Sequence, residues 1–390
     1  MRLGFASDCL KLVILLSAIA PAAAQPNDGR PEPPVVSAQD MAEYQQKLEE
    51  YTRAHQAFEA QASAYWTSVA EKRRARFGKR RNNQEIALDD YVLAQPPLYS
   101  GPPKPRDPSG IEPPPPPKPY VPAVADFLRA AAEQFDFVPQ RPQSEIEFKQ
   151  AYARVASAAG LTGEQVVRIY AFEVGGNGTY DVQAGLETPR QNAQAITTAL
   201  GYNQLLATNS VELLAEQGDR FVRLLNAKAA ASSGEAKAML ERKIDTLRRM
   251  IGFSRSVPDR WSEHEKLAAT PQGLGIHALN LDVDVGPLLQ TQKLFDSVVF
   301  ARRKGYATTL TAAELEAMNL TGDGNGFDIV MMPPALRDQV VTANFFQRGG
   351  YQRNPIAIRN NTVVKLLAAI DARMDREVKL PGARDLAAAF

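Results

Sequence analysis

The chain has 390 residues, of which 44% are hydrophobic, and its formal net charge is +1 at pH 7. This length and hydrophobic fraction are ordinary for two globular domains, or for one domain with long appendages. A net charge so close to zero argues against a general nucleic-acid-binding protein, so we expect no nucleic-acid partner. A neutral polymer, or a polymer of mixed charge, stays open as a substrate.

The first 24 residues have the pattern of a secretory signal peptide. Arg2 and Lys11 supply positive charge, and the apolar run over residues 12–20 is too short to span a bilayer as a stable helix. Three alanines ending at Ala24 provide the small residues that signal peptidase requires. We therefore expect cleavage near Ala24 and a periplasmic or secreted protein, with an uncleaved N-terminal anchor as the alternative. No later apolar run approaches the length of a membrane span, so none is expected in the mature chain.

The sequence offers neither a thiol site nor a metal site. The single cysteine, Cys9, lies inside the signal, which excludes thiol catalysis and disulfides in the mature protein. The three histidines, His55, His264 and His277, lack the spacing of zinc ligands. Residues 323–328 lack the glycine and the glutamate of an EF-hand loop, so we expect a turn there. Phosphate-binding, dinucleotide-binding and nucleophilic-serine fingerprints do not occur, and no cofactor is expected.

A long helix with a heptad pattern is predicted near the N-terminus. Residues 25–36 are proline-rich and should be extended, and residues 37–94 then hold this helix, roughly 38–77, with a basic tail. Its apolar seam can pack against the same chain. Self-association or contact with an envelope protein through residues 38–77, and an isolated helix, are the alternatives.

The helix ends in a basic run, with seven Lys and Arg between residues 72 and 81. Such a run is typical of a solvated helix end, where it complements the helix dipole. Contact with an anionic polymer or with lipid headgroups is the alternative.

A proline-rich spacer over residues 95–122 separates this helix from the rest of the chain. Prolines fix φ and lack an N–H donor, so the segment is predicted to be semi-rigid polyproline. From residue 123 to 390 the pattern is that of a helical domain. Thr162 with Gln165 and Thr311 with Glu314 supply capping boxes. The helices are expected at 123–135, 145–158, 163–173, 211–228, 234–251, 287–303, 312–318 and 362–377.

The candidate catalytic residue is Glu173, at the end of an amphipathic helix whose Val166 and Ile169 face a core. The negative end of the helix dipole and the apolar neighbours both favour the protonated acid there. A raised pKa suits a general acid near neutral pH. Three of the five residues from Val174 to Gly178 are glycines, which leave room for a sugar polymer close to the backbone.

Two polar stretches after Glu173 supply candidate substrate contacts through amide and phenol groups, which can hydrogen-bond to sugars. The first lies in the range 174–208, where we expect loops and a short hairpin, and includes Tyr180 and Gln183. The second, over residues 200–206, contains four candidates. These are Gly201, Tyr202, Asn203 and Gln204.

A helix-terminal Glu, a polar glycine-rich stretch and then Gly-x-x-Gln-Leu together resemble the lysozyme-like lytic transglycosylase superfamily. Glu173 matches the catalytic Glu, and Gly201 and Gln204 match the fixed positions of the second motif. The resemblance covers about residues 140–260, a third of the chain. The sequence departs from the family at Val174, where Ser is usual, and at the Tyr-Asn pair that replaces Leu-Met.

The resemblance implies a mainly α protein, in which a lysozyme-like helical domain with a C-terminal helical extension fills residues 123–390 after the long helix and the spacer. It implies cleavage of MurNAc–GlcNAc bonds in peptidoglycan glycan strands, with Glu173 as the single acid/base and a 1,6-anhydro product. A hydrolytic lysozyme, helped by a second carboxylate such as Asp181 or Glu187, is one alternative. A non-catalytic envelope protein that binds glycan or a partner through the heptad helix is the other.

Residues 342–354 combine adjacent aromatics, glycines and amides. A saccharide groove uses this composition, and so does an ordinary packed turn. Asn344 and Tyr351 are the candidates for a groove here. Transglycosylases often place a distant tyrosine beside the catalytic Glu, and Tyr351 and Tyr202 are the two candidates for that role.

Overall fold

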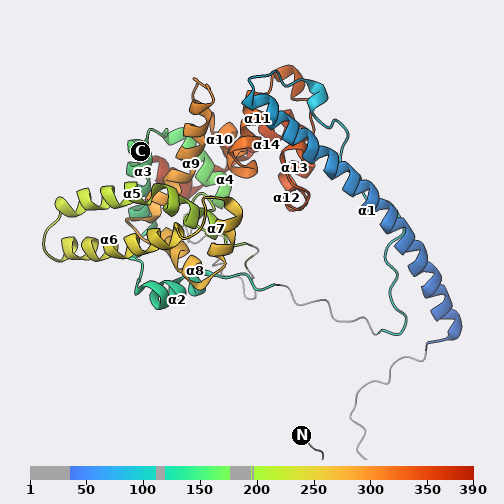
Figure 1. Cartoon of the computed structure of the whole chain (residues 1–390), viewed down its shortest axis with the longest axis horizontal. Helices are drawn as coiled ribbons and strands as arrows, with labels where there is room; N and C mark the ends of the chain where they lie inside the picture. The colour runs from blue at the N-terminus through green and yellow to red at the C-terminus, as the bar shows by residue number, and fades with distance from the viewer. Residues whose placement is uncertain (1–35, 111–118, 176–194, 196) are drawn as a thin grey trace, which may run out of the picture. The chain divides into compact units, whose positions relative to one another are not determined.

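The computed structural model describes residues 36–110, 119–175, 195 and 197–390 (Figure 1). Over these residues the chain forms helices and two isolated β-bridges without any β-strand, which confirms the predicted mainly α class. Within the same residues, no helix combines the length and the apolar character needed to cross a membrane. The chain divides into two compact units, one within residues 1–54 and 101–115 and the other within 55–100 and 116–390.

Helix α1 (Ala38–Arg81) is one continuous element of 44 residues. Its N-terminal part belongs to the first unit, where the Ser37 hydroxyl accepts a hydrogen bond from the Asp40 N–H at 3.0 Å. The same hydroxyl donates to the Asp40 carboxylate at 2.7 Å. These contacts satisfy an N–H that would otherwise lack a helical partner, as expected of a helix cap.

The C-terminal part of α1 packs within the second unit through a buried heptad face. Its buried positions are Ala62, Val69 and Arg76, seven residues apart. The Trp66 ring lies 5.6 Å from the ring of Tyr351 in the same unit. Of the interpretations that the heptad pattern left open, packing against the same chain is therefore the one found over this part of α1.

The basic run of α1 makes specific contacts with the second unit. The Arg76 guanidinium is fully buried and donates to the Asp328 carboxylate at 3.2 Å and to the Asn344 carbonyl at 3.1 Å. Arg80 also forms an ion pair with Asp328, and Arg73 donates to the Asn344 carbonyl at 3.2 Å. We call these five residues the α1 clasp. The prediction of a solvated helix end was wrong here, because charges that looked free in sequence are paired inside the fold.

The rest of the second unit is a bundle of mostly short helices (Figure 1). Helix α4 contacts α3, α10, α14 and α15, so it lies inside the bundle, while α5 and α6 form a long antiparallel hairpin. The α-helices are α2 (Val124–Phe135), α3 (Glu145–Ala159), α4 (Gly163–Val174), α5 (Ala207–Ala230), α6 (Gly234–Ser254), α7 (Trp261–Ala268), α8 (Pro271–His277), α9 (Gly286–Arg303), α10 (Ala312–Thr321), α11 (Asp323–Met331), α12 (Arg348–Gln352), α13 (Pro355–Arg359), α14 (Val363–Glu377) and α15 (Pro381–Ala387).

The capping boxes predicted from the sequence are present. The Thr162 hydroxyl accepts from the Gln165 N–H at 3.1 Å, and the Gln165 side chain accepts from the Thr162 N–H at 3.0 Å. Thr311 and Glu314 repeat this arrangement at the start of α10. Each box satisfies two N–H groups that a helix start leaves open, and so fixes where α4 and α10 begin.

The turn expected over residues 323–328 is instead the start of α11. Its Gly326 packs directly against α10, since a Cβ there would lie 2.3 Å from the Met318 Cα. Gly326 therefore permits the close approach of these two helices.

Candidate active site

Helix α4 carries Glu173 to the surface of the bundle. Val166, Ile169 and Tyr170 are buried on its inner face, and the helix ends at Val174. Gly175 then adopts φ +74°, a left-handed conformation that favours glycine, and its N–H donates to the Ala171 carbonyl at 2.9 Å. The side chain of Glu173 is partly exposed at this end.

Glu173 faces a second carboxyl group, that of Glu316 in α10. Glu316 is fully buried, and its carboxyl group lies beside the Glu173 carboxyl and the Asn319 amide. Two adjacent carboxyls, one fully and one partly buried, cannot both carry charge at low cost, so the pair holds a proton. Because Glu316 is the more buried, it is the group that keeps the proton and donates it in a hydrogen bond to Glu173.

The surroundings set the acidity of this pair. Burial raises the pKa of Glu173 to about 6. Four interactions lower this pKa and so partly offset the effect of burial: the hydrogen bond from Glu316, the charge of Arg373, the hydrogen bond from the Asn319 amide and the charge of Lys293. The Asn319 amide donates to Glu173 Oε1 at 2.6 Å. Burial, followed by the charge of Glu173, raises the pKa of Glu316 well above its ordinary value. Glu173 is therefore partly protonated near pH 6.

The buried acid Glu316 should make stability fall as pH rises. The unfolded chain releases this proton near the ordinary glutamate pKa, whereas the folded chain holds it to higher pH, so the free energy of unfolding decreases through that window. We expect Glu316→Gln, which keeps the shape and an N–H donor, to reduce this dependence and to be more stable than the wild type at about pH 8.

Thermal unfolding of both proteins between about pH 5 and pH 8 measures the effect. The control is Glu133→Gln, a change of the same kind at an exposed position of α2. Parallel pH dependence of the melting temperature in the wild type and in Glu316→Gln would contradict the assignment of the buried proton.

Glu173 forms part of the wall of a pocket of about 550 Å³. Residues of α4, α10, α13 and α14, and of the segments on either side of α13, line this pocket, and many of them are cationic or amide side chains. The polar lining residues are Glu173, Arg353, Asn354, Arg359, Asn360, Arg373 and Arg376.

Arg373 joins the pocket to the end of α4. Its guanidinium donates to the Phe172 carbonyl at 2.6 Å and lies 4.3 Å from the centroid of the Phe172 ring. It also donates to the Glu377 carboxylate at 2.9 Å. A cation at this position satisfies a free carbonyl and complements the negative end of the helix dipole, so Arg373 stabilises the turn that presents Glu173.

The structure places the Gly201–Leu205 stretch in the core. Leu200 and Leu205 exchange two backbone hydrogen bonds of 2.9 and 3.0 Å across a tight turn. Gly201 has φ +81°, and a Cβ there would lie 2.3 Å from the amide nitrogen of Gln290. Gln204 also has a positive φ, of 47°, and its side chain donates to the Gly201 carbonyl at 2.9 Å. Gly201 and Gln204, which were expected to contact the substrate, therefore form a tight turn instead.

Tyr202 and Asn203 are buried by the same turn. The Tyr202 ring lies 4.7 Å from that of Tyr170, and its hydroxyl donates to the Glu145 carboxylate at 2.7 Å. The Asn203 amide donates to the Tyr152 hydroxyl and to the Gln290 carbonyl, both at 2.7 Å. Neither residue lines the pocket beside Glu173. Through Tyr170, this turn supports the buried face of α4 instead.

Asn344 and Tyr351 also lie in the core. The Asn344 side chain accepts from the Val92 N–H at 2.9 Å and donates to the Val92 carbonyl at 2.7 Å. Tyr351 is buried against Trp66 and Phe346. The segment is a packed turn, which was the alternative interpretation of its composition. Four other candidates lie outside the described residues, namely Tyr180, Asp181, Gln183 and Glu187.

Sequence reasoning missed the partners of Glu173. Asn319 is 146 residues away along the chain, so no local spacing connects the two. Glu316 did leave a signal, because it stands in a stretch of α10 whose Leu315, Ala317 and Met318 are all apolar. A helix that is apolar on most sides is usually buried, so a carboxyl group on it is buried as well. A buried carboxyl group needs a hydrogen-bond partner.

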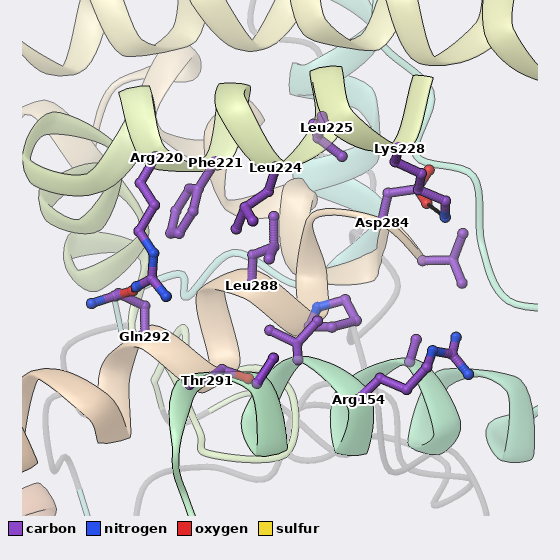
Figure 2. Close-up of a pocket in the computed structure, with 16 residues that line it drawn as sticks. Arg154, Arg220, Phe221, Leu224, Leu225, Lys228, Asp284, Leu288, Thr291 and Gln292 are labelled. Carbon is purple, nitrogen blue, oxygen red and sulfur yellow. Dashed lines mark hydrogen bonds and ion pairs between the residues drawn. The ribbon is translucent and has the colours of Figure 1, made fainter. Parts of the chain in front are cut away.

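A second cavity lies between α3, α5 and α9, with a volume of about 380 Å³ (Figure 2). Leu224 and Leu288 give it an apolar wall, and Arg154 reaches it from α3. The one carboxylate among the lining residues is Asp284. Burial raises its pKa, but the charges of Lys243 and Lys228 outweigh this effect, so the pKa of Asp284 lies below its ordinary value. This cavity therefore offers no acid for proton transfer.

An acidic group on α5 and α9 has raised pKa values as well. Burial, followed by the charge of Glu216, raises the pKa of Glu212 to about 7. Burial also raises the pKa of Glu216 and of Asp296. No set of three or more acidic, histidine or cysteine side chains in the described part of the chain is arranged to hold a metal ion.

Comparison with protein-family models, with curated proteins and with solved structures gave no match.

Proposed function

We propose that this protein is a peptidoglycan-cleaving glycosidase of the lytic transglycosylase type, with Glu173 as its single general acid/base. The observation that supports this most strongly is the acid itself: a partly buried glutamic acid of pKa about 6, held at the end of a helix on the wall of an open pocket. A general acid works best when its pKa lies near the operating pH.

In the proposed reaction, protonated Glu173 gives its proton to the oxygen of the bond between MurNAc and GlcNAc, and the bond from that oxygen to C1 of MurNAc breaks. The Glu173 carboxylate then takes the proton of the muramyl 6-hydroxyl while that oxygen bonds to C1. The product is a 1,6-anhydro sugar, and Glu173 is again protonated for the next cycle.

The position of Glu316 favours this route over hydrolysis with two carboxylates. In glycosidases the two carboxyls flank the sugar, about 5–5.5 Å apart in retaining enzymes and about 6.5–9.5 Å apart in inverting ones. Glu316 instead contacts Glu173 directly and has no exposed surface. It is therefore a positioning residue, which supplies a proton to the hydrogen bond that holds the Glu173 carboxylate.

We further propose that residues 123–390 form a lysozyme-like helical domain with a C-terminal helical extension, and that the protein acts in the periplasm or outside the cell after removal of its signal. The glutamate at the end of a buried helix supports the first assignment, and the signal pattern supports the second. The proline-rich spacer is suited to reaching a polymer meshwork.

The test is mass spectrometry of the soluble fragments released from peptidoglycan by the purified mature protein. Anhydro-muropeptides are expected. Fragments heavier by one water, with reducing ends, would instead indicate a hydrolase and direct attention to Asp181 and Glu187. Retained binding without any fragment would indicate a non-catalytic envelope protein.

The pH profile of cleavage should report the acidity of Glu173. Because the reaction begins with the protonated acid, kcat/KM is expected to fall as pH rises above about 6. Asn319→Leu removes a donor that favours the ionised form, so the pKa of Glu173 should rise and the alkaline limb should move to higher pH. An unchanged limb in this variant would contradict the assignment of the titrating group.

A further inference from the structure

The pocket beside Glu173 carries more positive charge than the chain neutralises. Four guanidinium groups line it, whereas Glu173 is the one carboxylate among its lining residues. Arg373 forms an ion pair with Glu377. Within the described part of the chain, no carboxylate lies within ion-pair distance of Arg353, Arg359 or Arg376.

These three arginines stand on or next to packed helices. Arg353 follows the last residue of α12, and Arg359 is the last residue of α13, whose Ala357 is fully buried and accepts a hydrogen bond from the Thr342 hydroxyl at 2.9 Å. The Asn354 side chain caps α13. Arg376 lies on α14, one turn after Arg373, and donates to the Ala372 carbonyl at 3.0 Å. The guanidinium groups are therefore gathered by packed helices.

The three side chains are exposed to solvent, so their N–H donors are available to an anion that enters the pocket. Guanidinium groups present paired N–H donors that match an oxyanion, and a concave site strengthens this interaction relative to a flat surface. The pocket thus has the donors of an oxyanion subsite beside a general acid. The sugar rings of a glycan strand have no charged group that would bind to such a subsite. The peptide stem on MurNAc carries carboxylates, which match it.

We propose that Arg353, Arg359 and Arg376 form an oxyanion-binding subsite that takes a carboxylate of the peptide stem next to the bond that is cut. The subsite rests on the proposed function, because it positions the stem of the MurNAc that Glu173 acts on. It makes the protein selective for strands that still bear peptides.

The test compares two substrates and two variants. The substrates are glycan strands with their stems and the same strands after the stem carboxylates have been converted to amides. The variants are the double change Arg353→Gln with Arg359→Gln, and Arg384→Gln as a control at an exposed position of α15. The double variant should lose about tenfold or more in kcat/KM on stem-bearing strands, as expected for lost charge-assisted hydrogen bonds. It should cleave the amidated strands as the wild type does.

Loss of equal size on both substrates, or on neither, would overturn the subsite. If the wild type cuts neither substrate, the proposed function fails, and binding to Glu173→Gln tests the subsite alone. The probes are the free stem peptide, the same peptide with its carboxylates amidated, and inorganic phosphate. Binding of the free acid, lost on amidation and in the double variant, supports the subsite. Binding of phosphate without the peptide would contradict the stem as its ligand.

Discussion

Glu173→Gln is expected to slow the release of anhydro-muropeptides by roughly 10²–10⁴-fold, the usual contribution of a general acid or base. Glutamine keeps the shape of the side chain and an oxygen that can accept from Asn319. It cannot give a proton to the glycosidic oxygen or take one from the muramyl hydroxyl. The loss should therefore appear in kcat, while binding to peptidoglycan is retained.

The matched control is Glu164→Gln, which makes the same change at an exposed position in the first turn of α4. It should cleave peptidoglycan at the wild-type rate. Thermal unfolding should show that Glu173→Gln is folded and no less stable at neutral pH, because a buried carboxyl with a raised pKa has been removed. Substantial anhydro product from a folded Glu173→Gln protein would exclude Glu173 as the acid/base.

Arg76→Ala is expected to lower the free energy of unfolding by about 3–5 kcal/mol, the cost of removing one partner from a buried ion pair. Asp328 would stay fully buried, with Arg80 as its one remaining cation in the α1 clasp. The Asn344 and Asp90 carbonyls would each lose a donor. The guanidinium also lies 4.5 Å from the centroid of the Tyr91 ring, and that contact would be lost.

Chemical unfolding of the full chain measures this effect, with Arg74→Ala as the control. Arg74 is an exposed neighbour on the same helix, and its replacement should change stability by less than about 0.5 kcal/mol. Equal stability of the two variants would mean that α1 does not contribute to the fold of the second unit through Arg76.

The longer helices could be predicted because their apolar residues recur with the helical period and their starts carry capping boxes. Helix α4 was expected over residues 163–173 and spans Gly163–Val174. The short helices α7, α8, α12, α13 and α15 were not predicted. Helix α12, for example, has five residues, and a helix of that length has little stability without the tertiary contacts that surround it.

The site was only partly predictable for a related reason. A helix-terminal glutamate followed by glycines is a local pattern, so Glu173 could be singled out. The arrangement of Glu316, Asn319 and Arg373 around it depends on how α10 and α14 pack against α4. The polar residues of the Gly201–Gln204 stretch were assigned to substrate, yet Tyr202 and Asn203 bond to the core, because polar side chains serve buried turns as readily as ligands.

The α1 clasp also sets a time order for folding. Arg76 and Asp328 are 252 residues apart, so α1 is synthesised long before the segment that receives it. Whether the chain is leaving the ribosome or crossing a membrane, Arg76 therefore emerges well before Asp328. During that interval the arginines of α1 lack the partners that they have in the folded protein. The contacts of the α1 clasp can therefore form only after the segment with Asp328 and Asn344 has followed α1.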